Sequence, residues 1–473
     1  MKRFWLFIAC ISMLCLSCEK DDADETRKPV SGETLKVNNF IFDDVKDCYL
    51  WTSTINWNQI NPKYEPDSYA FFEKLIYRAE DKWSMLTEDA KAFYNMLDGV
   101  STSFGYELIK GKFINSTALY AIVLYVYPDS PAEKAGLKRG DHLISISNKN
   151  ITDVNYMDLY NAPAISLGKA VLTDDGILAP DPHPVNMVAL TMYEDPVVKD
   201  TIVVKGTHRI GYLCYTNYTR ESERRLQEVF IGFKAQGVTD VVLDLRYNGG
   251  GYAETSRVLS SILAPGTVVK RKDIFLTQTW NDVLTAYFQK ESEDTNEYFM
   301  DNLPVNMDLN RLYVLTLRYS ASASEATMIG LKPYMDLIQI GEATHGKYYG
   351  GALLSPMVYD RRKNTWIADT EIENWLMYLM VYRYADKNGD TSFSGGLTPN
   401  YYMEEDYNYA LPPLGNECDP LFGKAIELIT GESVNTRSAQ SLPHPHTIDG
   451  VNLRSPLNGK MIQHRFLESF NKR

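Results

Sequence analysis

The stretch Leu-Tyr-Val-Leu-Thr-Leu-Arg-Tyr-Ser-Ala-Ser-Ala-Ser-Glu, residues 312–325, decides the fold of the largest part of this chain. Its first six residues are apolar or β-branched, which predicts a buried strand. Residues 326–331 (Ala-Thr-Met-Ile-Gly-Leu) then predict a helix start, with Ser322 or Ser324 near its N-cap. Strand and helix patterns also alternate upstream, within residues 201–245. We therefore expect an α/β core.

A serine between a strand end and a helix N-terminus is well placed for nucleophilic attack. The turn exposes its hydroxyl group, and the free N–H groups of the first helical turn can stabilise an oxyanion. The same small residues also fit a second interpretation, in which Ser and Ala only let the strand and the helix pack closely. Two further stretches decide between these interpretations.

The first is Gly341–Lys347 (Gly-Glu-Ala-Thr-His-Gly-Lys), which follows an apolar run. Lys347 comes 25 residues after Ser322, enough chain for one helix and one strand to return it beside the serine. A lysine can be the general base of a serine nucleophile when burial lowers its pKa. His345, two residues away, is a rival base, although a histidine in a turn more often has no catalytic role.

The second is Val241–Gly251, a hydrophobic strand that ends in Asp-Leu-Arg-Tyr-Asn and three glycines. Glycines let a main chain approach a substrate closely and present N–H groups to it. Such a loop can supply an oxyanion donor, although three glycines alone equally predict a plain turn.

Together these three stretches resemble the C-terminal processing (tail-specific) peptidases, serine peptidases with a Ser–Lys dyad. The resemblance implies that Ser322 is the nucleophile and Lys347 the base. It further implies oxyanion donors at the N–H of Ala323 and of a glycine, Gly250 or Gly249. It also implies an α/β (α+β) multidomain fold, in which a helical N-terminal region and a PDZ domain precede a spiral of ββα units.

The third catalytic partner is less defined by the motifs. Some members use the Glu three residues after the serine, a place that Glu325 occupies here. Others use a Gln four residues after the lysine, where this chain has Gly351. The resemblance therefore implies Glu325 as the third residue of the site.

Residues 129–144 carry the PDZ resemblance, with Pro131 suited to the first position of a helix and Gly136 to its end. PDZ domains bind an extended peptide by strand addition and hold its terminal carboxylate with loop N–H groups. Residues 104–108 (Phe-Gly-Tyr-Glu-Leu) are the expected binding loop and edge strand, although they match the usual Gly-Leu-Gly-Phe loop poorly.

A basic start and the apolar run 4–16 predict a signal peptide, and Cys18 at its end resembles the lipidated cysteine of bacterial lipoproteins. The acidic residues that follow predict a flexible spacer. The expected parts are a lipoprotein signal peptide at 1–18, a flexible spacer at 19–34, a helical N-terminal domain at 35–98, a PDZ domain at 99–200, a peptidase catalytic domain at 201–430 and a C-terminal tail at 431–473.

The composition argues against several classes of ligand. The 473 residues carry 48 Lys and Arg against 61 Asp and Glu, a net charge of −13 that argues against nucleic-acid binding. The cysteines expected to remain after removal of the leader are widely spaced and contain no Cys-x-x-Cys pair, so we expect no zinc site; they are Cys18, Cys48, Cys214 and Cys418. Residues 386–390 (Asp-Lys-Asn-Gly-Asp) have only partial calcium-loop spacing and predict a turn. No metal and no cofactor is expected.

The sequence thus predicts a serine endopeptidase of the bacterial cell envelope, lipid-anchored at the outer membrane. It would cleave proteins or peptides near a free C-terminus, with substrate recognition by the PDZ domain. Ordinary cleavage of the leader, giving a secreted protein, is the alternative to lipidation. A catalytically inactive, PDZ-containing peptide-binding lipoprotein is the alternative function, and an ester hydrolase on the same dyad is a third.

Overall fold

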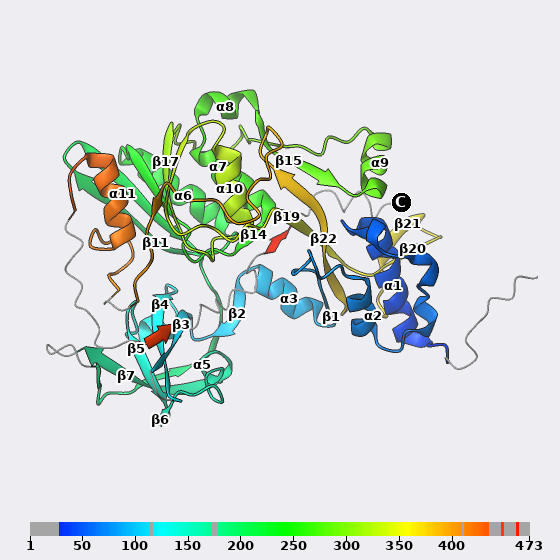
Figure 1. Ribbon diagram of the computed structural model, residues 1–473, viewed down its shortest axis with the longest axis horizontal. Coiled ribbons are helices and arrows are strands. Elements are labelled where there is room, and N and C mark those ends of the chain that lie inside the picture. The colour runs from blue at the N-terminus through cyan, green and yellow to red at the C-terminus, as the bar shows by residue number, and fades with distance from the viewer. Residues whose placement is uncertain are drawn as a thin grey trace, which may run out of the picture.

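The computed structural model describes residues 28–113, 117–172, 178–407, 411–434, 446–448 and 460–462. The expected leader and its Cys18 lie outside these residues. Helices and sheets combine in three regions, which confirms the expected α/β (α+β) multidomain class (Figure 1). Within the described residues, no helix is long and apolar enough to cross a bilayer.

The N-terminal region is helical, as predicted, but it also contributes a strand to the sheet that follows. Its helices are α1 (Gly32–Cys48), α2 (Ser68–Leu75) and α3 (Ala90–Leu97). The short strand β1 (Met85–Thr87) pairs antiparallel with β22 (Leu376–Ala385), almost 300 residues later. Apolar residues of α1, among them Val37, Ile41 and Val45, are buried in the same core as the catalytic part.

The middle region is a small sheet with two short helices. Its strands lie in the order β24-β3-β4-β5-β7-β8, with β6 and β9 at the side. These strands are β3 (Tyr106–Phe113), β4 (Leu119–Val126), β5 (His142–Ile146), β6 (Lys149–Asn150), β7 (Ala164–Leu172), β8 (Leu178–Pro180), β9 (Val185–Val188) and β24 (His446–Ile448). The predicted helix start is confirmed, since α4 (Pro131–Lys134) begins at the proline and Ser130 accepts the N–H of Glu133.

A two-stranded ribbon joins this region to its neighbours. In it β2 (Val100–Ser103) pairs antiparallel with β10 (Leu190–Tyr193). The second helix of the middle region is α5 (Asp158–Asn161).

The C-terminal region contains two sheets. The first has the order β11-β12-β13-β17-β18-β23, parallel throughout except for its first pair. Its strands are β11 (Val197–Lys205), β12 (His208–Tyr215), β13 (Asp240–Asp244), β17 (Arg311–Thr316), β18 (Asp336–Gly341) and β23 (Tyr401–Tyr402). The predicted strand before the serine motif is therefore β17, in the middle of this sheet.

This sheet is buried on both faces. Successive residues of each strand point to opposite faces, so each strand contributes side chains to both cores. One face packs on α6 (Ser222–Ala235), α7 (Ala253–Leu263) and α10 (Ala323–Leu331). The other face packs on α11 (Pro420–Thr430) and on apolar residues of β4. The middle region and the C-terminal region thus share one hydrophobic core.

The second sheet has the order β14-β25-β19-β22-β15-β16 and lies beside α10. Its strands besides β22 are β14 (Gly250–Tyr252), β15 (Ile274–Trp280), β16 (Glu297–Tyr298), β19 (Tyr349–Leu354) and β25 (Lys460–Ile462). The remaining elements are α8 (Gly266–Arg271), α9 (Asp282–Glu291) and the hairpin β20 (Met357–Asp360) and β21 (Thr365–Ala368). In the predicted C-terminal tail, the described segments 446–448 and 460–462 are therefore strands, one in each of two sheets.

Candidate active site

Ser322 is the N-cap residue of α10, directly after the turn that leaves β17. Its φ of 60° and ψ of −109° lie outside the regions that a non-glycine residue usually adopts. Strain of this kind persists only where the surrounding structure enforces it. The side chain is buried and faces the N–H of Glu325 in a capping-box arrangement, but the geometry there falls short of a hydrogen bond, and the Oγ atom has no other partner among the described residues. The hydroxyl group therefore remains available for another interaction.

The two flanking serines have structural roles. Ser320 donates its hydroxyl to the carbonyl oxygen of Leu245 at 2.8 Å, and Ser324 donates to that of Asn248 at 3.0 Å. The N–H of Ala321 also donates to Asn248, at 3.1 Å. These bonds attach the serine turn to the start of the glycine loop and distinguish the middle serine from its neighbours.

Lys347 is buried at the entry to β19. Its Nζ atom lies 3.5 Å from the hydroxyl of Tyr378 and 5.1 Å from the ring centre of Trp83. The side chain of His345, the rival base, is exposed instead. The structure thus places the lysine, and not the histidine, inside the protein.

The carboxylate of Glu325 joins the segments that carry these two residues. One oxygen, Oε2, accepts the N–H of Ser322 at 2.7 Å and the N–H of Lys347 at 3.0 Å. The other, Oε1, accepts the hydroxyl of Thr344 and the N–H of Gly346, each at 2.6 Å. Burial raises the pKa of Glu325 to about 7, although these four hydrogen bonds oppose the rise.

Glu325 therefore acts on the main chain around the dyad. Each of these four hydrogen bonds holds the serine turn or the segment that leads to the lysine, and none of the four involves the Oγ or Nζ atom. The alternative orienting position has no room for a side chain, because a Cβ atom at Gly351 would meet Met380 and Tyr378 at 2.4 and 2.5 Å.

Two aromatic residues of this site were missed by sequence reasoning. Tyr384, from β22, places its hydroxyl 3.0 Å from the carbonyl oxygen of Ser322 and also within hydrogen-bond distance of that of Lys347. Trp83 comes from the N-terminal region, where its main-chain N–H donates to the carboxylate of Asp81 at 2.9 Å. Neither residue lies in a motif, so no sequence signal pointed to them.

The glycine loop lies beside the serine turn in a conformation that favours glycine. The φ angles of Gly250 and Gly251 are 117° and 139°, and a Cβ atom at Gly251 would overlap the main chain of Tyr218. The N–H of Gly250 donates to the side chain of Asn248 at 2.9 Å. To serve as an oxyanion donor, Gly250 would have to give up this bond. Ala323 opens α10, so its N–H has no partner within the helix.

A buried ionic cluster lies below the glycine loop. Arg246 pairs with Asp244, Asp419 and Glu405 at 2.6, 2.9 and 2.8 Å. Arg139, from the middle region, reaches the same Glu405 and donates to the hydroxyl of Tyr247 at 2.8 Å. The loop that follows Arg246 is thus anchored to both regions.

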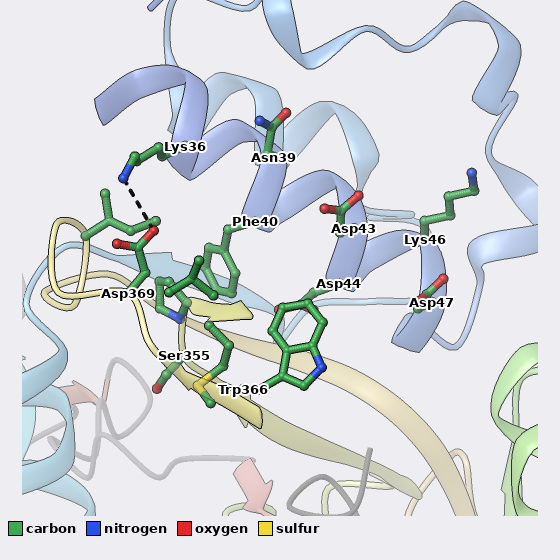
Figure 2. A pocket seen from close by; sticks show the side chains of 14 residues that line it. Lys36, Asn39, Phe40, Asp43, Asp44, Lys46, Asp47, Ser355, Trp366 and Asp369 are labelled. Carbon is green, nitrogen blue, oxygen red and sulfur yellow. Dashed lines mark ion pairs between the residues drawn. The ribbon is translucent and has the colours of Figure 1, made fainter. Parts of the chain in front are cut away.

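A hollow of about 500 Å³ lies elsewhere, between α1 and the hairpin β20–β21 (Figure 2). Asp43, Asp44 and Asp47 lie along one side, and Phe40 and Trp366 provide apolar surface. None of the residues that line it belongs to the dyad, so we assign it no part in the chemistry. The described residues contain no group of three or more His, Cys, Asp or Glu that could hold a metal ion.

Known domains match the chain in the order that its motifs predict. The N-terminal domain of peptidase S41 matches residues 36–85, a PDZ domain matches 122–159, and peptidase family S41 matches 209–403. The last range contains the serine turn, the lysine and the glycine loop.

Two curated relatives and one solved structure show the same similarity. The chloroplastic C-terminal processing peptidase of Tetradesmus obliquus is 25% identical over 296 residues, 59% of this chain and 59% of that protein. The carboxy-terminal processing protease CtpA of Bacillus subtilis (strain 168) is 23% identical over 330 residues, 65% of this chain and 63% of that protein. This chain thus spans about three fifths of the length of the curated relatives that it matches.

The crystal structure of a candidate S41 protease from Bacteroides fragilis NCTC 9343 supports the fold. It superposes with a TM-score of 0.68 and 23% sequence identity, covering 83% of this chain and 97% of that chain. This chain thus contains an S41 N-terminal domain, a PDZ domain and an S41 peptidase domain, in that order.

Proposed function

We propose that this protein is a serine endopeptidase that uses Ser322 as its nucleophile and Lys347 as its general base. The observation that carries the proposal is the buried Oγ atom of Ser322, which has no hydrogen-bond partner among the described residues. A buried hydroxyl group without a hydrogen bond lowers the stability of the folded state. Its presence here is therefore better explained by a catalytic role than by packing. Ser320 and Ser324 already donate their hydroxyl groups to main-chain carbonyl oxygens, which favours the middle serine as the nucleophile.

In the proposed reaction, the Oγ atom attacks the scissile carbonyl carbon while the Nζ atom of a neutral Lys347 takes the hydroxyl proton. The resulting ammonium then gives this proton to the leaving amine, and the acyl group remains on the serine. Water releases the acyl group with the same lysine as base. Burial disfavours the charged form of an amine, and the side chain of Lys347 is completely buried. The rings of Trp83 and Tyr378 favour the charged form instead, so burial has to outweigh them in this role.

The N–H of Ala323 is the oxyanion donor that the helix start supports best. A second donor comes from the glycine loop, through Gly249 or, after release of Asn248, through Gly250. Glu325 is a positioning residue for both sides of the dyad.

The proposed substrates are proteins or peptides cleaved near a free C-terminus. The PDZ domain supports this proposal, because such domains receive an extended C-terminal segment at an edge strand. The two curated relatives are named as C-terminal processing enzymes, which agrees with it.

The test compares the wild-type chain with Ser322→Ala and Lys347→Ala on an unfolded protein that ends in a free apolar C-terminus. Peptide products are identified by mass spectrometry from about pH 6 to about pH 10, a range that covers the titration of a lysine shifted by burial. We expect both variants to lose at least about a thousandfold in rate. We expect wild-type cleavage to rise towards alkaline pH.

Ser320→Ala and Ser324→Ala are the matched controls, since each removes a hydroxyl group from the same turn. Both should weaken the fold and keep most of the activity. Cleavage that survives Ser322→Ala would assign the reaction to another serine. A wild-type chain that cleaves none of several substrates would favour the inactive peptide-binding protein.

We further propose that Cys18 is lipidated and anchors the chain in the envelope of a bacterium, at the outer membrane. The apolar run that ends at Cys18 and the acidic spacer behind it support this. Metabolic labelling with a palmitate analogue should mark the wild-type chain and leave Cys18→Ser unlabelled. Labelling of the serine variant would contradict the proposal.

A further inference from the structure

The last described segments of the chain extend the two sheets that a peptide substrate of this protein would use. β24 pairs antiparallel with Gly111–Phe113 at the edge of β3, in the PDZ domain. β25 pairs parallel with β14 on one side and with β19 on the other. In Figure 1 they are the two red arrows, one on the middle sheet and one between β14 and β19.

β25 lies as an extended strand between the strand that follows the glycine loop and the strand that follows the proposed base. Lys460 stands opposite Gly250, at the start of β14, where the glycine loop ends. Ile462 stands opposite Tyr252 and Gly351. The strand β19 begins two residues after Lys347. The main chain of 460–462 therefore runs between the proposed oxyanion loop and the strand that follows the proposed base.

Burial at this place has a functional consequence. Ile462 is completely buried, in one core with Tyr252 and Tyr349. Ser322, Ala323 and Lys347 likewise have no exposed surface. An endopeptidase must admit the main chain of its substrate to the serine, so the arrangement seen here has to open before a substrate enters.

We propose that the segment Lys460–Ile462 of this chain is a resident pseudosubstrate, which occupies the substrate cleft between β14 and β19 and competes with incoming peptides. The identity of this cleft rests on the proposed peptidase function. Strand addition supplies the affinity through main-chain hydrogen bonds, and the buried place of Ile462 selects an aliphatic side chain. The class of ligand that fits is thus an extended peptide with an aliphatic residue at this position.

The PDZ edge takes part in the same arrangement. β24 occupies one end of β3, the strand expected to receive a peptide C-terminus, and only 11 residues separate β24 from β25. One continuous segment of the chain therefore pairs with both of the surfaces proposed to bind a substrate. An external substrate would have to displace it from each.

The strength of this competition follows from tethering. A tethered segment has an effective concentration in the millimolar range. If the free segment binds with a Kd of about 0.1 mM, the tether reduces the affinity for a competing peptide about tenfold.

The test measures binding and needs no catalysis. A fluorescein-labelled peptide with the sequence of residues 457–466 is titrated against two proteins that both carry Ser322→Ala, one full-length and one lacking residues 460–473. Fluorescence anisotropy reports the affinity. We expect the shortened protein to bind the peptide and the full-length protein to bind it about tenfold more weakly. Equal affinities, or no binding to the shortened protein, would overturn the proposal.

Point variants provide the matched comparison. Ile462→Asp in the full-length Ser322→Ala chain should restore peptide binding, because a buried carboxylate without a partner expels the strand. The same change at Ile231, which is 46% exposed on α6, should leave binding weak. The labelled peptide with Ile462→Asp should bind neither protein.

A permanent structural strand is the competing interpretation, and it predicts a different result. In that case both the shortened chain and Ile462→Asp would lose their cooperative thermal transition, and this outcome would also overturn the proposal. If the peptidase activity is present, removal of 460–473 should in addition lower KM about tenfold at unchanged kcat. Failure of the peptidase itself leaves the anisotropy result intact, so the two proposals fail separately.

Discussion

The carboxylate of Glu325 accepts the main-chain N–H of Ser322 at 2.7 Å, and both residues are completely buried. The oxygen that accepts this bond also accepts the N–H of Lys347 at 3.0 Å. A single atom thus sets the distance between the two segments that carry the proposed dyad. Rotation of this carboxylate would move the serine and the lysine relative to each other.

We therefore expect Glu325→Gln to fold and to lose most of its kcat. Whichever way the amide is turned, its NH₂ group faces two of the four donors that the carboxylate accepts, so two hydrogen bonds are lost. A loss of about 10- to 100-fold in kcat with little change in KM fits a misplaced dyad. Glu342→Gln, which affects a partly exposed pair with Arg318, is the matched control and should keep its rate.

The pH profile separates this positioning role from a purely structural one. The pKa of Glu325 is raised to about 7, so the carboxylate that accepts all four bonds forms as the pH rises through about 7. The wild-type rate should contain a rise centred there, in addition to that of the lysine. Glu325→Gln should lack this component. An identical profile in both proteins would contradict the positioning role.

The sequence was sufficient for the parts of the site that lie in contiguous motifs. The position of Ser322 at a strand-to-helix turn follows from the β-branched run before it and the helix formers after it. Lys347 is buried, as a lysine that acts as a base has to be, and Glu325, which the family resemblance implied, is buried as well. Local patterns encode these features because each depends on one or two adjacent elements.

The parts of the site that come from residues distant in the sequence could not be predicted. Trp83 reaches the site from the N-terminal region and Tyr384 from β22 of the second sheet, and their positions depend on the pairing of β1 and β15 with β22. The strand β25 has only three residues, too few for any periodic signal. The pairing of Arg139 with Glu405, 266 residues apart, likewise depends on how two domains pack.

The hydroxyl of Tyr384 should contribute measurably to stability, whereas that of Tyr382 should not. Tyr384→Phe removes the donor that the buried carbonyl oxygens of Ser322 and Lys347 share, at a cost of about 1–3 kcal/mol. Tyr382→Phe, two residues away on β22, removes a buried hydroxyl that has no hydrogen-bond partner among the described residues. It should be neutral or slightly stabilising. Urea unfolding measures both, and equal losses would show that the shared contact is unimportant.

Arg139→Met should destabilise the chain strongly. It leaves Glu405 and the hydroxyl of Tyr247 without one of their partners inside the protein, and loss of one member of a buried ion pair costs about 3–5 kcal/mol. Arg271→Met is the matched control, because Arg271 is 62% exposed beside Asp273, and it should leave the free energy of unfolding almost unchanged. A similar free energy of unfolding for both variants would contradict this account.

The same cluster predicts how stability changes in acid. Burial opposes ionisation of Glu405, but the charges of Arg139 and Arg246 outweigh it and hold its pKa at about 2. A lowered folded-state pKa means that the stabilisation is complete above about pH 4.5 and is lost as the pH falls towards 2. Glu405→Gln should be less stable than the wild type at neutral pH, and the difference should shrink across this window. Thermal melts at several pH values measure the difference.

Asp44 should have the opposite effect, because it lies in the acidic wall of the hollow between α1 and the hairpin β20–β21 (Figure 2). Burial first, and then the neighbouring charges of Asp43 and Asp47, raise the pKa of Asp44 to about 8. The native state therefore holds its proton more tightly than the unfolded state, and stability falls as the pH rises from about 4 to about 8.

Asp44→Asn removes this loss, so the stability of the variant relative to wild type should rise between pH 5 and pH 8.5, by on the order of 1 kcal/mol or more. Asp44 keeps some contact with solvent, which reduces the gain below that of a fully enclosed group. Asp153→Asn, at a side chain that is 75% exposed, should show no such change with pH. A constant difference between Asp44→Asn and wild type across this range would mean that water already solvates the carboxylate, and that the hollow is open to solvent at this wall.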